Sequence, residues 1–378
     1  MSLPNILARL DSNIRPLLTI LPSHLFASLY SSTSRWYADL ASKDTNLQPI
    51  EVPPELSRTV AGLEFRSPIC NAAGMYKYAE GYHKSYLLGA GAFIAGTTTS
   101  SVRIGNAKKG ISLPFAPYPH SHSASNWLGL PNAGHAAIAK KIQTFPRYKK
   151  FPIGASVSAD PGMKQELALP LLIEGITSYI KALVDFIEIN ESCPNVEGHQ
   201  QTDISSLDQD LLIRLEVISK QIIQKYNHIP VFVKFSNDTN TNQIPELLQV
   251  LIDLGFSGIN LGNTSTKYSY YRDKIDKRDL EIYDYFTHTF GGGLSGRILR
   301  EDSLSLCKSA HQYIQSKQLQ KEFAIISTGG IQNGSDISNA IMSGASLTQW
   351  YTGYYEQYGK HTYDIYKKIY EDIDIKIL

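Results

Sequence analysis

Short apolar runs alternate with segments of helical periodicity from about residue 60 onward, and this alternation limits the chain to few architectures. It is the signature of βαβ units, which build parallel sheets. Eight parallel strands close a (β/α)8 TIM barrel, although an open doubly wound sheet also fits the alternation. The eight runs that predict strands are Ser67–Ala73, Ala92–Thr99, Phe151–Ser158, Val184–Ser192, Pro230–Ser236, Gly258–Asn263, Phe323–Gly330 and Leu347–Gly353.

The C-terminal ends of these runs carry polar residues or glycine, which favours the barrel over the open sheet. Barrels of this kind hold their catalytic groups at the C-terminal ends of the strands. We therefore expect one converging ring of functional side chains. The residues at or just beyond these ends are Lys77, Thr97, Ser156, Asn190, Lys234, Asn263, Gly330 and Tyr351.

Residues 1–45 precede the barrel pattern and predict a pair of helices outside it. Apolar residues from Ile6 to Leu18 keep helical spacing, Pro16 and Pro22 interrupt the run, and a second apolar series follows from Leu25 to Leu40. We expect a helical extension over residues 1–45 and a catalytic barrel domain over residues 46–378.

Composition argues against several functional classes. Lysine plus arginine number 36 and aspartate plus glutamate 35, so no global field attracts nucleic acid. Three cysteines without a CxxC argue against a disulfide framework or zinc site, and His120 and His122 lack a third ligand, so no metal is expected. No run reaches the ~18 apolar residues that a spanning helix needs, and Asp11, Arg15 and Pro16 interrupt the apolar region of a signal peptide, so neither secretion nor a membrane span is expected. A cytoplasmic location is expected.

The densest motif is Asn190-Glu191-Ser192-Cys193-Pro194-Asn195, at the end of the fourth run. A free cysteine titrates near pH ~8.5, so a thiolate at this rim is a candidate base. An arbitrary cysteine is more often a buried structural thiol, and Cys70 and Cys307 are assigned that role. Lys234 ends an apolar strand, where a lysine that points into a barrel is costly unless it meets an anion.

The motif around Cys193 resembles the catalytic loop of the dihydroorotate dehydrogenases, which are FMN-dependent barrels that oxidise dihydroorotate to orotate in pyrimidine synthesis. The resemblance covers roughly residues 60–360 and implies that Cys193 is the base and that Lys77 contacts flavin and substrate together. Further segments that resemble the family are residues 72–77, 96–97, 126–132, 292–297, 327–330 and 351–353.

The resemblance implies FMN as cofactor and dihydroorotate and orotate as ligands. Implied cofactor-binding residues are Ala73, Gly74, Lys77, Thr97, Ser156, Asn190, Lys234, Gly262, Gly296, Gly329, Gly330, Tyr351 and Thr352. Implied substrate-binding residues are Lys77, Asn126, Trp127, Leu128, Gly129, Leu130, Asn190, Asn195, Asn263 and Thr264. Carboxamides suit a pyrimidinedione because each offers both donors and acceptors to its alternating N–H and C=O edge.

The electron acceptor is open between two branches of that family. Cys193, Ser156 and Leu130-Pro131-Asn132 resemble the soluble class, which reduces fumarate, or NAD through a partner subunit. Residues 1–45 and the Gly-Leu-Ser-Gly-Arg segment resemble the membrane-associated class, whose N-terminal helices form a quinone tunnel. Gly262 stands where that class usually has threonine, and Glu191 where an apolar residue is common.

Quinone is the expected acceptor, because a helical pair that carries Tyr30, Trp36 and Tyr37 is an expensive addition unless it contacts a bilayer or a lipid-like ligand. The expected location is then peripheral, on the cytoplasmic face of the inner membrane. The alternative is that residues 1–45 merely cap the barrel and that fumarate is the acceptor.

Three other classes fit part of the pattern. A tRNA dihydrouridine synthase also joins an FMN barrel to a reactive cysteine, but the net charge of +1 offers no basic face. A non-catalytic phosphate-binding barrel would need the glycine loops but not the candidate base, the two lysines or the asparagines. A 2-hydroxyacid oxidase should have a histidine base and paired arginines at the rim, and no such pair is found.

Two loops outside the strand runs are also predicted to have a role. Residues 196–205 predict a mobile lid, and residues 265–293 predict an insertion that is functional or partly mobile.

Overall fold

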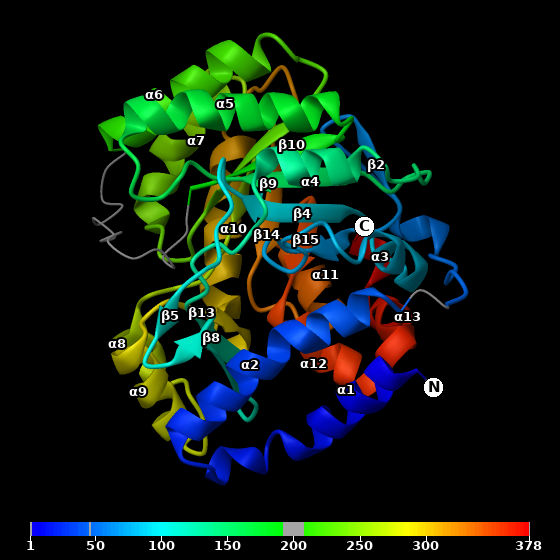
Figure 1. Ribbon diagram of the computed structural model, residues 1–378. Helices are drawn as coiled ribbons and strands as arrows, with labels where there is room; N and C mark the ends of the chain where they lie inside the picture. Colours follow the sequence, from blue (N-terminus) through cyan, green and yellow to red (C-terminus); the bar gives the residue numbers. More distant parts are fainter. Residues whose placement is uncertain (1, 45–46, 192–207, 378) are drawn as a thin grey trace.

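The central element is an eight-stranded parallel sheet, seen in a computed structural model that describes residues 2–44, 47–191 and 208–377. Its strand order is β3-β15-β14-β12-β11-β10-β9-β4, which follows the sequence around a ring (Figure 1). Each strand falls within a predicted run, so the prediction of a (β/α)8 barrel is confirmed. The strands are β3 (Ile69–Asn71), β4 (Phe93–Thr98), β9 (Ile153–Val157), β10 (Phe186–Asn190), β11 (Val231–Phe235), β12 (Gly258–Leu261), β14 (Ala324–Thr328) and β15 (Leu347–Trp350).

A side chain closes the ring between β3 and β4. The Asn71 carboxamide donates to the carbonyl of Ile94 at 2.8 Å and accepts from the amide of the same residue at 3.0 Å. Just beyond the end of β3, Tyr76 and Ala95 form a parallel bridge. Asn71 thus supplies the paired donor and acceptor that a neighbouring strand would otherwise provide.

Helices cover the outside of the barrel. In α6, Leu211, Leu215 and Ile218 are buried at the predicted helical spacing, whereas the intervening Leu212 and Ile213 are not. The covering helices are α3 (Tyr82–Leu88), α4 (His135–Ile142), α5 (Gln165–Lys181), α6 (Gln209–Ile218), α7 (Ile244–Asp253), α10 (Arg300–Gln315), α11 (Gly334–Met342), α12 (Thr352–His361) and α13 (Ile365–Glu371).

The interior of the barrel is layered. Phe186, Phe232, Ala324 and Leu347 belong to one apolar cluster that fills one end. Two residues further along three of these strands stand Glu188, Lys234 and Gln349, and side chains two apart in a strand share a face. A polar layer therefore lies between the apolar plug and the C-terminal ends of the strands.

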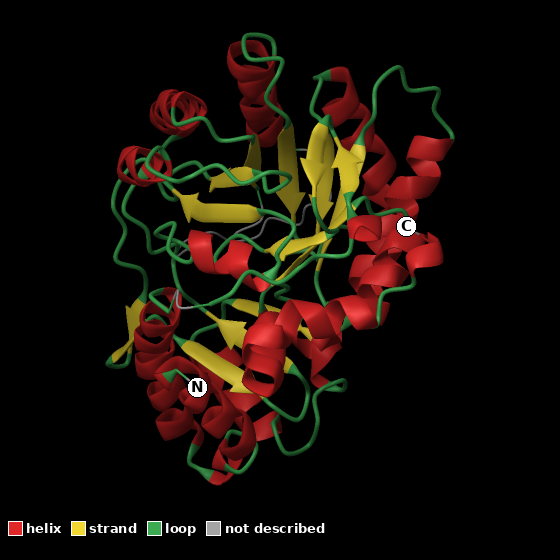
Figure 2. Cartoon of the chain, turned by 90° about the vertical axis from the view of Figure 1, so that its right-hand side faces the viewer, coloured by secondary structure: helices red, strands yellow, loops and turns green. Residues whose placement is uncertain are grey.

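A second body of structure packs beside these C-terminal ends (Figure 2). Its antiparallel sheet has the order β13-β8-β7, and residues 265–293 contribute helices that bury Tyr271, Tyr283 and Phe286. The insertion is thus a packed part of a core, built from β7 (Phe115–Tyr118), β8 (Ser123–Asn126), β13 (Gly293–Gly296), α8 (Tyr268–Arg272) and α9 (Leu280–Thr289). Short hairpins are β1 (Arg58–Val60) with β2 (Leu63–Phe65), and β5 (Ala107–Lys108) with β6 (Ile111–Ser112).

The N-terminal segment forms α1 (Leu3–Ile14) and α2 (Ser23–Ser42), which confirms the predicted helical pair. The pair runs along the lower side of the molecule in Figure 1, where α1 packs against α12 and α2 against β7 and α9. Helix α2 buries Phe26, Ala27 and Tyr30 in the core of the second body.

The outward face of α1 is apolar, and exposed apolar side chains continue into α2, where polar residues such as Ser28 and Ser32 are exposed beside them. Among the most exposed large apolar side chains of the described residues are Leu3, Ile6, Leu10, Ile14, Leu17, Ile20, Leu25, Leu29 and Trp36. In α1 the polar Asn5 faces the protein and is 1% exposed, while Leu10 is 52% exposed, so the usual amphipathic orientation is reversed. No helix of the described residues is long and apolar enough to cross a membrane.

Candidate active site

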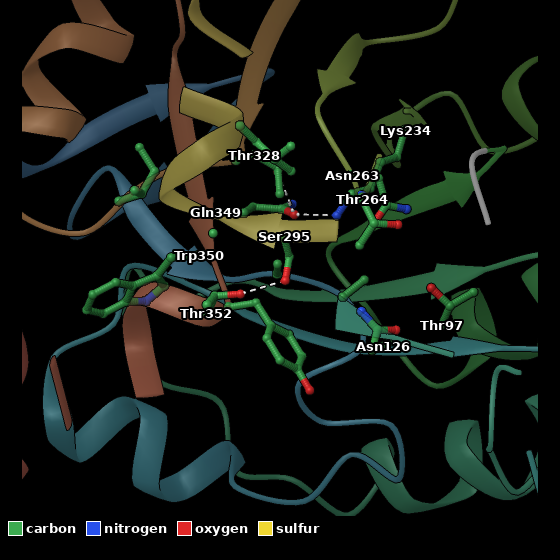
Figure 3. Close-up of a pocket in the computed structure, with 18 of the residues that line it drawn as sticks. Thr97, Asn126, Lys234, Asn263, Thr264, Ser295, Thr328, Gln349, Trp350 and Thr352 are labelled. Carbon is green, nitrogen blue, oxygen red and sulfur yellow. Dashed lines mark hydrogen bonds between the residues drawn. The ribbon is translucent and has the colours of Figure 1, made fainter. Parts of the chain in front are cut away.

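One cavity of about 1000 Å³, counted with its open mouth, lies at the C-terminal ends of the barrel strands (Figure 3). Residues from β10, β11, β14 and β15 meet there with β8 and β13 of the second body. Its lining includes Ala72, Ala73, Gly74, Lys77, Thr97, Asn126, Leu128, Leu130, Asn190, Lys234, Asn263, Thr264, Ser295, Gly296, Leu299, Thr328, Gly329, Gly330, Ile331, Gln349, Trp350, Tyr351, Thr352 and Gly353.

The ammonium of Lys234 lies at the inner end of this cavity. The side chain is 2% exposed, and its Nζ donates to Gln349 Oε1 at 3.2 Å, as the dashed line in Figure 3 shows. Thr328 Oγ1 lies 3.2 Å from the same oxygen. Burial lowers the pKa of Lys234, and the carboxyl of Glu188 opposes that shift. The cavity thus offers a buried cation to a ligand that carries or develops negative charge.

A chain of hydrogen-bonded polar side chains forms one wall. Asn263 Nδ2 donates to Asn190 Oδ1 at 3.4 Å, Asn190 Nδ2 donates to Thr97 Oγ1 at 3.0 Å, and Thr97 Oγ1 lies 2.9 Å from Ser156 Oγ. Asn126 comes from β8 on the other side, where its Nδ2 is 3.5 Å from the carbonyl oxygen of Gly293. These carboxamides present both donors and acceptors around one space.

Glycines at the ends of β14 and β15 form a cradle. Gly329 and Gly330 have φ values of +134° and +78°, a left-handed backbone that glycine adopts without strain. A Cβ on Gly353 would lie 2.0 Å from the carbonyl oxygen of Ile331, so no larger residue fits there. Thr352 and Gly353 begin α12, whose first amides have no partner within the helix, and Thr352 Oγ1 donates to Ser295 Oγ at 2.9 Å.

The residues present fit a ligand that combines a phosphate with a polar planar ring. A helix N-terminus beside glycines that admit close backbone approach is a phosphate site, and barrels place it after the seventh and eighth strands. Thr264 Oγ1 is a buried atom with no hydrogen-bond partner among the described residues, and Thr264 lines the same cavity. The lining therefore contains a hydroxyl group that is available to hydrogen-bond a ligand.

Most of the predicted site residues that the structure describes line the cavity, but four of them do not. Ser156 is buried behind Thr97, and Trp127 packs beside Phe290 in the second body with ring centroids 6.5 Å apart. Gly262 is outside the lining: its φ is +106°, and a Cβ there would lie 1.5 Å from the carbonyl oxygen of Thr328, which excludes a threonine in this conformation. Gly129 faces Asn106 and Arg103 instead of the cavity.

Some predictions concern residues 192–207, which lie outside the described residues. They are the base Cys193, the substrate ligand Asn195 and the lid over residues 196–205. The two predicted loop histidines have other contacts, because His122 Nδ1 is 3.1 Å from Glu356 Oε2 and His120 Nε2 is 3.2 Å from the carbonyl oxygen of Pro16.

Three buried polar residues at or below the inner end of the cavity were missed in the sequence. Glu188, Asn260 and Gln349 are each at most 1% exposed and are joined to Lys234 in one network. Glu188 and Asn260 each stand between two apolar residues of a buried strand, and that setting was the available signal, whereas Gln349 follows Thr348 and is less conspicuous. A polar residue in a strand buried on both faces needs a partner inside the barrel.

Taken together, the fold and the cavity define an α/β barrel with a polar, glycine-edged cavity at the C-terminal ends of its strands, the usual place of the active site in barrel enzymes. The sequence also matches the family model described as dihydroorotate dehydrogenase over residues 55–375, and the chain belongs to that family.

Named relatives and solved structures agree with this membership. A dihydroorotate dehydrogenase (quinone) of Nocardia farcinica is 28% identical over 309 residues, which cover 80% of this chain and 75% of the relative. A protein of the same name from Christiangramia forsetii is 27% identical over 319 residues, with 84% and 85% covered. The ligand-free DHODH of Eimeria tenella superposes with a TM-score of 0.72 at 21% identity, covering 91% of this chain and 93% of the other, and thus supports the fold.

Proposed function

We propose that this chain oxidises dihydroorotate to orotate and that FMN is its bound hydride acceptor. The observation that carries the proposal is the coincidence, in one cavity, of a glycine cradle at Gly329 and Gly330, a buried ammonium at Lys234 and a carboxamide wall. Family membership gives this arrangement its chemical meaning. A tRNA dihydrouridine synthase or a 2-hydroxyacid oxidase is not favoured.

The cofactor is assigned to the inner part of the cavity. The glycines of the cradle and the first amides of α12 would hold its phosphate, while Lys234, Thr97 and Asn190 would bind the polar edges of its ring. When bound, FMN supplies the acceptor for the hydride that leaves C6 of dihydroorotate. Lys234 would stabilise negative charge that develops beside it during reduction.

The substrate is assigned to the outer part, between the cofactor and the second body. Asn126, Asn190 and Asn263 would pair with its N–H and C=O groups, and Lys77 would meet its carboxylate. In this assignment Cys193 acts as the thiolate that takes the proton from C5. Lys77 Nζ donates to the carbonyl oxygen of Gly74 and lies 5.9 Å from the centre of the Tyr351 ring, at the edge of the cavity.

Quinone is the proposed electron acceptor. Two observations support it: relatives that share most of the chain are named for quinone, and α1 turns an apolar face away from the protein. In this proposal residues 46–378 carry the chemistry, while residues 1–45 rest on a membrane surface and lead a lipid-like oxidant toward the cavity. We place the protein peripherally, on the cytoplasmic face of the inner membrane.

Anaerobic mixing with dihydroorotate tests the reaction, and reoxidation tests the acceptor. We expect the flavin absorbance to bleach with dihydroorotate and to return quickly with a short-chain quinone, but slowly with fumarate. A flavin that does not bleach contradicts the reaction. Fast return with fumarate alone would leave the reaction intact and make residues 1–45 a structural cap.

A further inference from the structure

The buried polar layer beneath the cavity contains a second charge besides Lys234. Glu188 is 0% exposed, and its Oε2 accepts from Asn260 Nδ2 at 2.7 Å and from Gln349 Nε2 at 2.8 Å. Its Oε1 has no hydrogen-bond partner among the described residues and lies 4.0 Å from Lys234 Nζ. Glu188 does not line the cavity and is therefore separated from any ligand by Lys234 and Gln349.

The neighbours of Glu188 direct donors at its carboxyl group. The carboxamides of Asn260 and Gln349 both turn N–H groups toward Oε2, so this oxygen acts only as an acceptor, and the Lys234 ammonium is the charged group that lies near Oε1. The remaining hydrogen bonds are donated to the oxygens of the same two carboxamides. Gln349 Oε1 accepts from Lys234, and Asn260 Oδ1 accepts from Thr328 Oγ1 at 2.7 Å. The network thus runs from the Lys234 ammonium through Gln349 to the Glu188 carboxyl group.

We propose that Glu188 is a positioning residue for the reaction: it is the fixed counter-charge that keeps Lys234 protonated and directed at the inner end of the cavity. The proposal rests on the proposed function, because it concerns the charge that a bound flavin meets. A lysine buried in a barrel loses its proton readily unless an opposite charge lies within a few ångströms. Glu188 supplies that charge from below, so the upper side of the ammonium remains available to the cofactor.

Few other groups act on the Lys234 ammonium. Besides Glu188 on β10, the titratable group that affects it among the described residues is Cys70 on β3, whose thiol has a pKa that burial raises, so it stays neutral. The other strands of this layer contribute neutral side chains, namely Asn260 on β12, Thr328 on β14 and Gln349 on β15.

The test is the reduction potential of the bound flavin, measured against reference dyes from mildly acidic to mildly alkaline pH. In Glu188→Gln we expect a higher potential than the parent at acidic pH, because the charge of Lys234 is no longer compensated. As pH rises the potential should fall more steeply than the parent's and reach that of Lys234→Met, because Lys234 then loses its proton. The parent should show no such steep segment.

A carboxylate moved to the other contact of Lys234 should restore the parent's behaviour. Gln349 Oε1 is 3.2 Å from Lys234 Nζ, so the double variant Glu188→Gln/Gln349→Glu is expected to lose the steep segment. Glu191→Gln is the matched control, since Glu191 follows the same strand but pairs with Arg214 at 2.7 Å and lies outside the cavity lining. Its potential should follow that of the parent.

Two results would overturn the inference. One is a Glu188→Gln potential that runs parallel to the parent's at every pH, and the other is a steep segment that persists in Glu188→Gln/Lys234→Met. If Glu188→Gln alone does not retain flavin, the double variant with Gln349→Glu decides, and its failure to recover flavin also contradicts the proposal. Failure of the proposed function differs, because the parent itself would then bind no flavin or resist dihydroorotate.

Discussion

Cys193 is the residue whose replacement separates binding from chemistry. Cys193→Ala should retain its flavin, because the thiol is assigned to the proton of the substrate, while anaerobic reduction of that flavin by dihydroorotate slows about 10²–10⁴-fold. Stopped-flow absorbance measures the rate. Cys307→Ala is the control, because Cys307 is buried in α10 and should keep the parental rate. Parental reduction in Cys193→Ala would exclude the thiol as base.

Gly330 tests the glycine cradle. Gly330→Ala places a Cβ 2.5 Å from Arg300 Cα, so the loop must shift and flavin affinity should fall at least about tenfold. Gly62→Ala is matched for backbone strain, with φ +79° against +78°, but nothing lies within 4 Å of its Cβ. Both variants share the cost of a left-handed alanine, about 1–2 kcal/mol. Flavin affinity is measured by fluorescence titration, and equal affinity in Gly330→Ala and Gly62→Ala would show that Gly330 is not part of the cradle.

The sequence predicted the residues of the site unevenly, and the reason is physical. Lys234 and Asn190 were found because they end apolar strands, where the fold class alone specifies a functional rim. Glu188 and Gln349 were missed because a single polar residue inside a strand does not reveal which side chains it meets. That meeting depends on closure of the barrel, which brings together strands far apart in the chain.

At the scale of helices and strands, the buried side chain of Lys84 joins the N-terminal helical pair to the barrel. Its side chain, 2% exposed in α3, donates to the carbonyl oxygen of Ala41 in α2 at 2.8 Å and to Tyr358 Oη in α12 at 2.9 Å. Tyr358 in turn donates to Asn5 Oδ1 in α1 at 2.7 Å. Three helices therefore meet at one ammonium, and α1 is linked to it through Tyr358. Burial lowers the pKa of Lys84 to about 8.

This lowered pKa makes stability depend on pH in a defined direction. The unfolded chain holds the proton up to the ordinary value of 10.5, so unfolding takes up a proton between about pH 8 and that value, and the free energy of unfolding rises with pH there. Relative to Lys84→Met, the parent should gain on the order of 3 kcal/mol across this window. Urea titrations at several pH values measure the difference. Lys140→Met, at an exposed site, should show no such trend.

The predicted elements were those whose evidence is local. Eight strands and the N-terminal helices follow from apolar spacing within short windows, and prolines at positions 16 and 22 set the break between α1 and α2. The sheet β13-β8-β7 was not predicted, because it pairs Gly293–Gly296 with Ser123–Asn126 across most of the barrel sequence. Short strands of that kind carry no periodic signal.

The whole molecule presents its apolar helical face as a candidate membrane surface. The triple variant Ile6→Gln/Leu10→Gln/Leu17→Gln should lower binding to phosphatidylglycerol-containing vesicles at least about tenfold, because each leucine or isoleucine loses its transfer free energy. Flotation measures the bound fraction. A control with Ile104→Gln and Met342→Gln, which are 88% and 62% exposed elsewhere, should bind as the parent does. Unchanged binding by the triple variant would show that this face does not contact lipid.

The pairing of Glu188 with Lys234 also bears on how the protein matures. A barrel with only a buried ammonium would need an anionic ligand in place before its strands could close, because an unpaired interior charge opposes folding. With the carboxylate already 4.0 Å away, the interior is electrically neutral from the outset. We therefore expect the newly made chain to assemble its barrel first and to load its cofactor afterwards, so that flavin supply would limit activity without limiting the yield of folded protein.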